Sequence, residues 1–174
     1  YRAQSRAGYE ADRWQLMLLD RVKGTSRSLT ENFDSSVETP VWSPDGKALY
    51  FPAEAKANKN LYAVTLKGND VRAVVSGGYN TSACVSPDGR TLLFSRSSAV
   101  RAAELFRAMV DGSGLTAVTS FNDTVFAALD IPAPESITWA GDGGTSIQGW
   151  LYKPPGFDPA KKYPLVMMVH GGPQ

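Results

Sequence analysis

The sequence has very few of the residues that build cross-links and metal sites. One cysteine, Cys84, cannot form an internal disulfide, and its strand-like surroundings predict a small buried side chain rather than a reactive thiol. One histidine, His170, stands without the cysteine or carboxylate spacing that would complete a zinc site. These shortages exclude a disulfide-stapled fold, and they give no support for a metal or any other cofactor.

Long apolar runs and a charge of one sign are also missing. No apolar stretch approaches the roughly 20 residues that cross a bilayer, and 18 basic against 17 acidic residues leave a net charge of +1. We therefore expect neither a membrane nor a nucleic acid as a partner. The chain begins at Tyr1 without a secretory signal, so it reads as the middle of a longer protein whose compartment is undetermined.

What the sequence does have is an internal repeat over its first two thirds. The motif Ser43-Pro44-Asp45-Gly46 returns 43 residues later as Ser86-Pro87-Asp88-Gly89. A second motif agrees, because Leu105 follows Leu61 by 44 residues and Leu61 follows Leu16 by 45 residues. Repeats of about 40–45 residues that are rich in short strands are typical of β-propeller blades.

The repeated motif has the chemistry of a tight turn. Proline fixes φ, aspartate bonds the neighbouring backbone and glycine supplies a positive φ, while alternating apolar and polar flanks suit a hairpin. We therefore expect full four-stranded blades over residues 36–76 and 79–119, and the outer half of an earlier blade over residues 14–29. Asp45 and Asp88 are interpreted as turn residues rather than metal ligands, because no other oxygen ligands gather near them in the sequence.

The pattern changes after Ser120. Residues 121–129 lack strict alternation and suit a short helix, and Pro132 and Pro134 then make an extended connector. Residues 136–152 predict a β-hairpin, and the apolar run at 165–169 predicts a strand buried on both faces of a sheet. We therefore divide the chain into residues 1–120, a linker over residues 121–135 and a second domain over residues 136–174.

The tetrapeptide His170-Gly171-Gly172-Pro173 follows the apolar run directly. Glycines in that place let the backbone approach a ligand and offer N–H groups to an oxyanion, as α/β-hydrolases do after a buried strand. The alternative is an ordinary turn. His170 is interpreted as structural, because the catalytic histidine of that fold comes last in chain order, after the nucleophile.

Taken in order, these elements resemble the prolyl oligopeptidase family of serine peptidases, in its acylaminoacyl-peptidase and dipeptidyl-peptidase branch. The elements are the two Ser-Pro-Asp-Gly repeats, the proline-rich linker, the run Ile147-Gln148-Gly149-Trp150-Leu151 and His-Gly-Gly-Pro. The resemblance implies a mostly β chain, with β-propeller blades followed by the first strands of an α/β-hydrolase domain. It also implies a serine exopeptidase that hydrolyses short peptides through an acyl-enzyme, with the remainder of both domains as partners. Gly172 would be the backbone donor to the oxyanion, and Gly171 the lesser candidate.

Several alternatives stay open from the sequence alone. It contains no Gly-x-Ser-x-Gly, so the nucleophile, acid and base are absent, and we expect the chain alone to be inactive. A non-catalytic propeller that binds proteins explains residues 1–120 equally well, and a propeller-linked esterase is the third reading. Glu54, Glu104 and Glu135 are equivalent candidates to hold a substrate's free amine. The oligomeric state, including a homo-oligomer, is undetermined.

Overall fold

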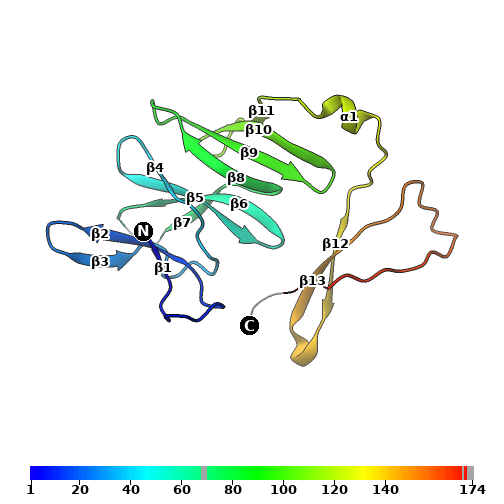
Figure 1. Ribbon diagram of the computed structural model, residues 1–174, viewed down its shortest axis with the longest axis horizontal. Helices are drawn as coiled ribbons and strands as arrows, with labels where there is room; N and C mark the ends of the chain where they lie inside the picture. The colour runs from blue at the N-terminus through cyan, green and yellow to red at the C-terminus, as the bar shows by residue number, and fades with distance from the viewer. Residues whose placement is uncertain (68–69, 170, 172–174) are drawn as a thin grey trace.

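Two four-stranded antiparallel blades form the middle of the computed structural model, which describes residues 1–67, 70–169 and 171 (Figure 1). A parallel bridge between Lys59 and Tyr79 joins them into one eight-stranded sheet. Within each blade the strands lie in chain order, as the repeat predicts, so the two predicted blades are confirmed. Blade 1 consists of β4 (Val41–Trp42), β5 (Ala48–Ala55), β6 (Asn58–Thr65) and β7 (Val71–Val75). Blade 2 consists of β8 (Tyr79–Val85), β9 (Thr91–Ser98), β10 (Arg101–Met109) and β11 (Thr116–Ala117).

The two Ser-Pro-Asp-Gly motifs make the same turn between the first two strands of each blade. Ser43 Oγ accepts the Ala48 N–H at 2.9 Å and donates to Asp45 Oδ1 at 2.7 Å. In blade 2 the serine hydroxyl accepts a backbone N–H at 2.9 Å and donates to Asp88 Oδ1 at 2.5 Å. The hydrogen bond from the serine hydroxyl contributes most to lowering the pKa of each aspartate, and a hydrogen bond from a backbone N–H lowers it further. The interpretation of both aspartates as turn residues is therefore confirmed.

Blade 1 is covered on both faces, because successive side chains of a strand point to opposite sides of the sheet. Phe51 packs into the core shared with the preceding sheet, and its neighbour Tyr50 packs into the core shared with blade 2. In blade 2 only one face is covered. Leu92 and Phe94 are 0% and 1% exposed, whereas Leu93 between them is 37% exposed.

The predicted burial of Cys84 is wrong, since its side chain is exposed. Cys84 pairs with Leu93 across the sheet, so both lie on the uncovered face of blade 2. The neighbouring pair, Val85 and Leu92, lies on the covered face and packs in the core. The strand was predicted, but which of its faces is covered depends on the blade's neighbours.

A three-stranded sheet precedes blade 1. It contains the two expected strands, β2 (Gln15–Asp20) and β3 (Thr25–Ser28), and also β1 (Arg2–Ala3), which pairs with β2. β1 was not predicted, because two paired residues carry no repeat motif and no alternation. The buried side chains of Leu16 and Leu29 join this sheet to the core of blade 1.

The chain beyond blade 2 forms a short helix and a separate hairpin (Figure 1). The helix α1 (Asp123–Ala127), the strands β12 (Glu135–Ala140) and β13 (Ser146–Leu151), and the turn η1 (Asp142–Gly144) between them agree with the predicted elements. No helix in the described part of the chain is long and apolar enough to cross a membrane.

The predicted buried strand at residues 165–169 is not formed in this structure. These five apolar residues lie outside any strand, and their side chains are 74–91% exposed. A strand buried on both faces needs neighbours that pair with its backbone on each side. None of the strands in residues 1–67 and 70–169 pairs with this segment.

Candidate functional site

The predicted oxyanion residues lie at the limit of what the structure describes. His170, Gly172 and Pro173 fall outside the described residues, and Gly171 is described as an exposed residue outside any strand or helix. The assignment of Gly172 and Gly171 as oxyanion donors therefore stays a prediction.

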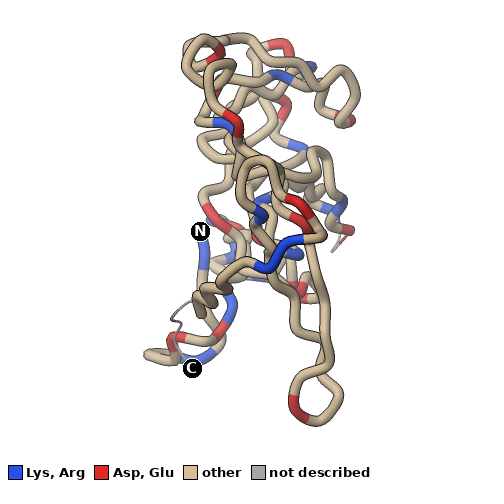
Figure 2. Tube along the Cα trace, turned by 90° about the vertical axis from the view of Figure 1, so that its right-hand side faces the viewer, with Lys and Arg blue, Asp and Glu red and all other residues tan. Residues whose placement is uncertain are grey.

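Several charged side chains gather at one end of the two blades, which we call the exit edge. It is formed by the ends of β5 and β9 and the beginnings of β6, β8 and β10, where Lys59 lies beside Tyr79 and Tyr79 beside Ser97. The chain leaves blade 2 at the same edge, since the Asn122 N–H donates to Glu104 of β10. The two Ser-Pro-Asp-Gly turns lie at the opposite end of the strands. Basic and acidic residues are interspersed along the trace (Figure 2).

Lys59 is the centre of one cluster on the exit edge. Its side chain is 6% exposed, it forms ion pairs with Glu38 and with Glu54 Oε1 at 3.5 Å, and it donates to the Tyr79 hydroxyl at 2.8 Å. Burial acts to lower the pKa of Lys59, but the hydrogen bonds to Glu38 and Tyr79 outweigh it and raise the pKa above its usual range. Two carboxylates thus share one ammonium group, which leaves one negative charge in excess.

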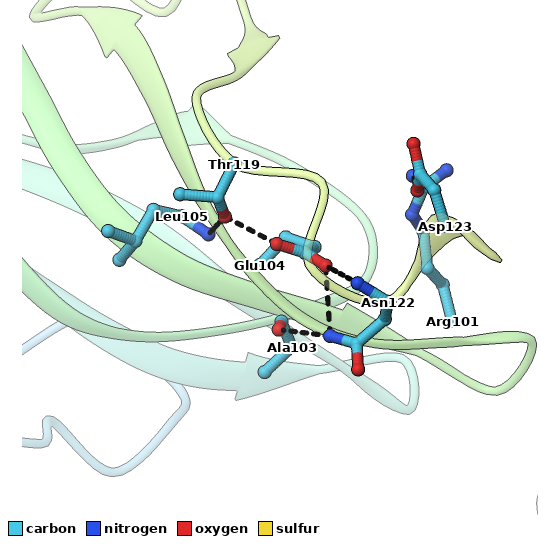
Figure 3. A network of polar contacts seen from close by, with 7 residues as sticks. All are labelled: Arg101, Ala103, Glu104, Leu105, Thr119, Asn122 and Asp123. Carbon is cyan, nitrogen blue, oxygen red and sulfur yellow. Dashed lines mark hydrogen bonds and ion pairs between the residues drawn. The ribbon is translucent and has the colours of Figure 1, made fainter. Parts of the chain in front are cut away.

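Glu104 is the centre of a second cluster, shown in Figure 3. The residue is 2% exposed, and its carboxylate accepts the Thr119 hydroxyl, the Asn122 N–H at 2.7 Å and Asn122 Nδ2 at 2.9 Å. The Thr119 hydroxyl lowers the pKa of Glu104 most, and the Asn122 donors help bring it to about 2 against the burial that would raise it. The chain's own donors occupy this carboxylate, so Glu104 is not available to hold a substrate amine.

The other two glutamates singled out from the sequence differ in place and in exposure. Glu135 lies on the hairpin and pairs with Lys153 Nζ at 2.5 Å. Glu54 lies on the exit edge with a side chain that is 69% exposed. No sequence motif pointed to Glu38. It reaches the same place because Val37 bridges to Ala53 and the Glu38 N–H donates to the Pro52 carbonyl at 2.9 Å.

Known proteins are similar to the chain along almost its whole length, although no family model matches it. It is 31% identical over 172 residues to dipeptidyl-peptidase 5 of Porphyromonas gingivalis, with 99% of this chain and 25% of that protein covered. It is 36% identical over 172 residues to dipeptidyl-peptidase 5 of Porphyromonas endodontalis, with 99% and 25% covered. The chain therefore spans about a quarter of the length of these curated relatives.

A solved structure shares the fold. Acylaminoacyl peptidase of Pyrococcus horikoshii matches 88% of this chain and 23% of its own, with a TM-score of 0.71 and 19% sequence identity. The expected order of propeller blades followed by the first strands of a hydrolase domain agrees with this likeness.

Proposed function

We propose that this chain is a segment of a serine exopeptidase of the prolyl oligopeptidase family, and that the whole protein acts on short peptides. The observation that carries the proposal is the similarity over 99% of the chain to two proteins named dipeptidyl-peptidase 5. This favours release of dipeptides from a free amino terminus over release of an acylated residue. Residues 1–120 are propeller blades, residues 121–135 the linker and residues 136–174 the beginning of the hydrolase domain.

In this proposal the backbone N–H of Gly172 binds the oxygen of the scissile carbonyl. That oxygen gains negative charge as the nucleophilic serine attacks, so a donor placed beforehand stabilises the tetrahedral intermediate and the acyl-enzyme forms faster. The serine, the acid and the base lie outside the 174 residues, so the chain alone is expected to be inactive. Gly171 is the second candidate for the donor.

We place the free amine of the substrate at the exit edge, beside Glu38 and Glu54. The two carboxylates share the single ammonium group of Lys59, and Glu54 keeps a side chain that is 69% exposed. An incoming ammonium group would balance the excess negative charge of the two carboxylates. It would bind beside the Tyr79 hydroxyl, which already accepts a hydrogen bond from Lys59. Lys59 then acts as the residue that holds both carboxylates in position.

Steady-state kinetics of the whole protein test this assignment. Glu54→Gln and Glu38→Gln should each raise KM for a free-amine dipeptide substrate by roughly tenfold, because one charge-assisted hydrogen bond is lost. KM for the same substrate with an acetylated amine should stay unchanged in both variants. Glu10→Gln removes an exposed carboxylate elsewhere and serves as the matched control. An equal rise in KM for the free-amine and the acetylated substrate would contradict an amine site at Glu38 and Glu54.

A serine-directed fluorophosphonate and a pair of peptide and ester substrates test the proposed activity itself. We expect the whole protein to be labelled stoichiometrically and to hydrolyse dipeptide substrates, while the 174-residue chain is not labelled. Labelling with turnover of esters alone would favour the propeller-linked esterase. A whole protein that binds peptides without labelling or turnover would be the non-catalytic binding module.

A further inference from the structure

The exit of the chain from blade 2 is held by the Glu104 cluster rather than by apolar packing. Every residue of α1 is at least partly exposed, and a hollow of about 470 Å³ lies beside the helix, lined by Val100, Arg101 and Phe126 among others. Polar contacts must therefore fix the position of this segment. Besides the three donors to Glu104, the Leu105 N–H donates to Thr119 Oγ1 at 3.0 Å, and Arg101 pairs with Asp123 (Figure 3).

The same arrangement occurs between the two blades, which identifies it as part of the propeller. Asn60 precedes Glu104 by 44 residues, the repeat length, and occupies the corresponding place on β6. Asn60 Oδ1 accepts the Gly77 N–H at 2.8 Å, at the start of the passage from β7 to the next blade. In blade 2 the carboxylate of Glu104 takes this role and binds the Asn122 N–H instead.

The hydrogen bonding changes immediately after α1. The Ala128 and Leu129 N–H groups still bond within the helix end, at 3.2 Å each. Within the described residues, positions 130–134 make no hydrogen bond to another part of the chain, and the next ordered pairing begins with β12 at Glu135. Two of these five positions are prolines, which have no N–H to donate.

We propose that Glu104 latches the start of the linker to blade 2, so that residues 119–127 belong to the propeller and the joint to the hairpin lies at residues 128–134. Glu104 is a positioning residue, because it fixes the place on blade 2 at which the connection to the following domain begins. The latch rests only on contacts within the described chain and is independent of the proposed peptidase activity.

Hydrogen exchange of the whole protein, followed by mass spectrometry, tests the latch. In the wild type, peptides within 119–127 should exchange slowly and those within 129–134 rapidly. Glu104→Ala should accelerate exchange in 119–127 by about tenfold or more, because a buried acceptor of charge-assisted bonds is removed. Exchange in β5 and β6 should not change, which separates local release from global unfolding. Glu10→Ala is the matched control, since it removes an exposed carboxylate from another region.

If the Glu104→Ala protein does not fold, a second and milder variant, Asn122→Ala, still tests the latch. Asn122→Ala removes the Nδ2 donor at 2.9 Å and keeps the backbone N–H, so it should accelerate exchange in 119–127 by a smaller factor. Limited proteolysis should cut the wild type first within 128–134 and a latch variant also within 118–123. Rapid exchange of 119–127 in the wild type would overturn the proposal, and so would slow exchange in a folded Glu104→Ala protein.

Discussion

The blades and the segment that follows them contain similar apolar side chains, but these side chains are buried in the blades and exposed in the segment. Phe51 and Phe94, in the blades, are 0% and 1% exposed, whereas Phe121, Trp139 and Trp150 are 83%, 44% and 41% exposed. Beyond Ala108 no residue of the described chain is buried. Apolar patterning alone therefore does not create a core, because burial also requires a facing surface that the fold brings within contact.

The difference follows from where each strand finds its partner. A blade strand pairs with the next strand after a short turn, and one of its faces is covered by the adjacent blade about 45 residues away. The hairpin β12–β13 is a single antiparallel pair, and within the described residues its two strands pair through backbone hydrogen bonds only with each other. We conclude that the stability of this chain resides in residues 1–127, whereas the proposed oxyanion donors lie beyond that part.

Truncating one aromatic side chain in each part gives the largest expected contrast. Phe94→Ala should lower the free energy of unfolding of the chain by about 3–5 kcal/mol, because it leaves a cavity in the core between the blades. Phe121→Ala, at 83% exposure, should change it by about 0.5 kcal/mol or less. Urea denaturation followed by circular dichroism measures both, and equal effects would abolish the contrast.

The second prediction separates activity from stability in the whole protein. Gly172→Pro removes the proposed donor N–H and should lower kcat by roughly 10²–10³, with little change in KM, because the bond is strongest in the transition state. The melting temperature should stay near that of the wild type. Gly171→Pro is the matched variant, and a larger loss of kcat there would move the donor to Gly171. A folded Gly172→Pro enzyme with near-normal kcat would return the motif to an ordinary turn.

The third prediction concerns acid, and the sign follows from the lowered pKa of Glu104. The folded-state pKa is about 2, against an ordinary value of 4.5, so the ionised form is bound more tightly by the folded chain. This contribution is fully present above pH 4.5 and is lost as the pH falls toward 2. Glu104→Gln should therefore be less stable than the wild type at neutral pH, and the difference should shrink below pH 4.5. Denaturation midpoints across this range would contradict the account if the difference stayed constant.

The smallest effect is expected at the repeated turns. Ser86→Ala removes the hydroxyl that accepts the Thr91 N–H and donates to Asp88, so it should cost about 1 kcal/mol of the free energy of unfolding. Ser43→Ala should behave alike, since its hydroxyl makes the corresponding bonds. An exposed serine of the hairpin, Ser146, provides the control, whose replacement by alanine should be close to neutral.

Features set by local sequence could be predicted, and those set by distant contacts could not. Proline, aspartate and glycine fix the turns within four residues, so the blades and the turns between their first two strands followed from the repeat. The joint role of Glu38 and Lys59 could not be foreseen, because an isolated bridge between Val37 and Ala53 brings them together. The predicted burial of Cys84 and of the run at 165–169 is wrong for a related reason, since burial depends on neighbours that the sequence pattern does not reveal.

We infer that stable structure in this chain ends near residue 127, a claim that residue-resolved hydrogen exchange of the 174-residue chain can test. We expect the amides of β5, β6, β9 and β10 to exchange at rates limited by global unfolding. Amides in 129–134 and 163–169 should exchange nearly as fast as in an unstructured peptide. Protection of residues 163–169 equal to that of β6 would contradict the claim.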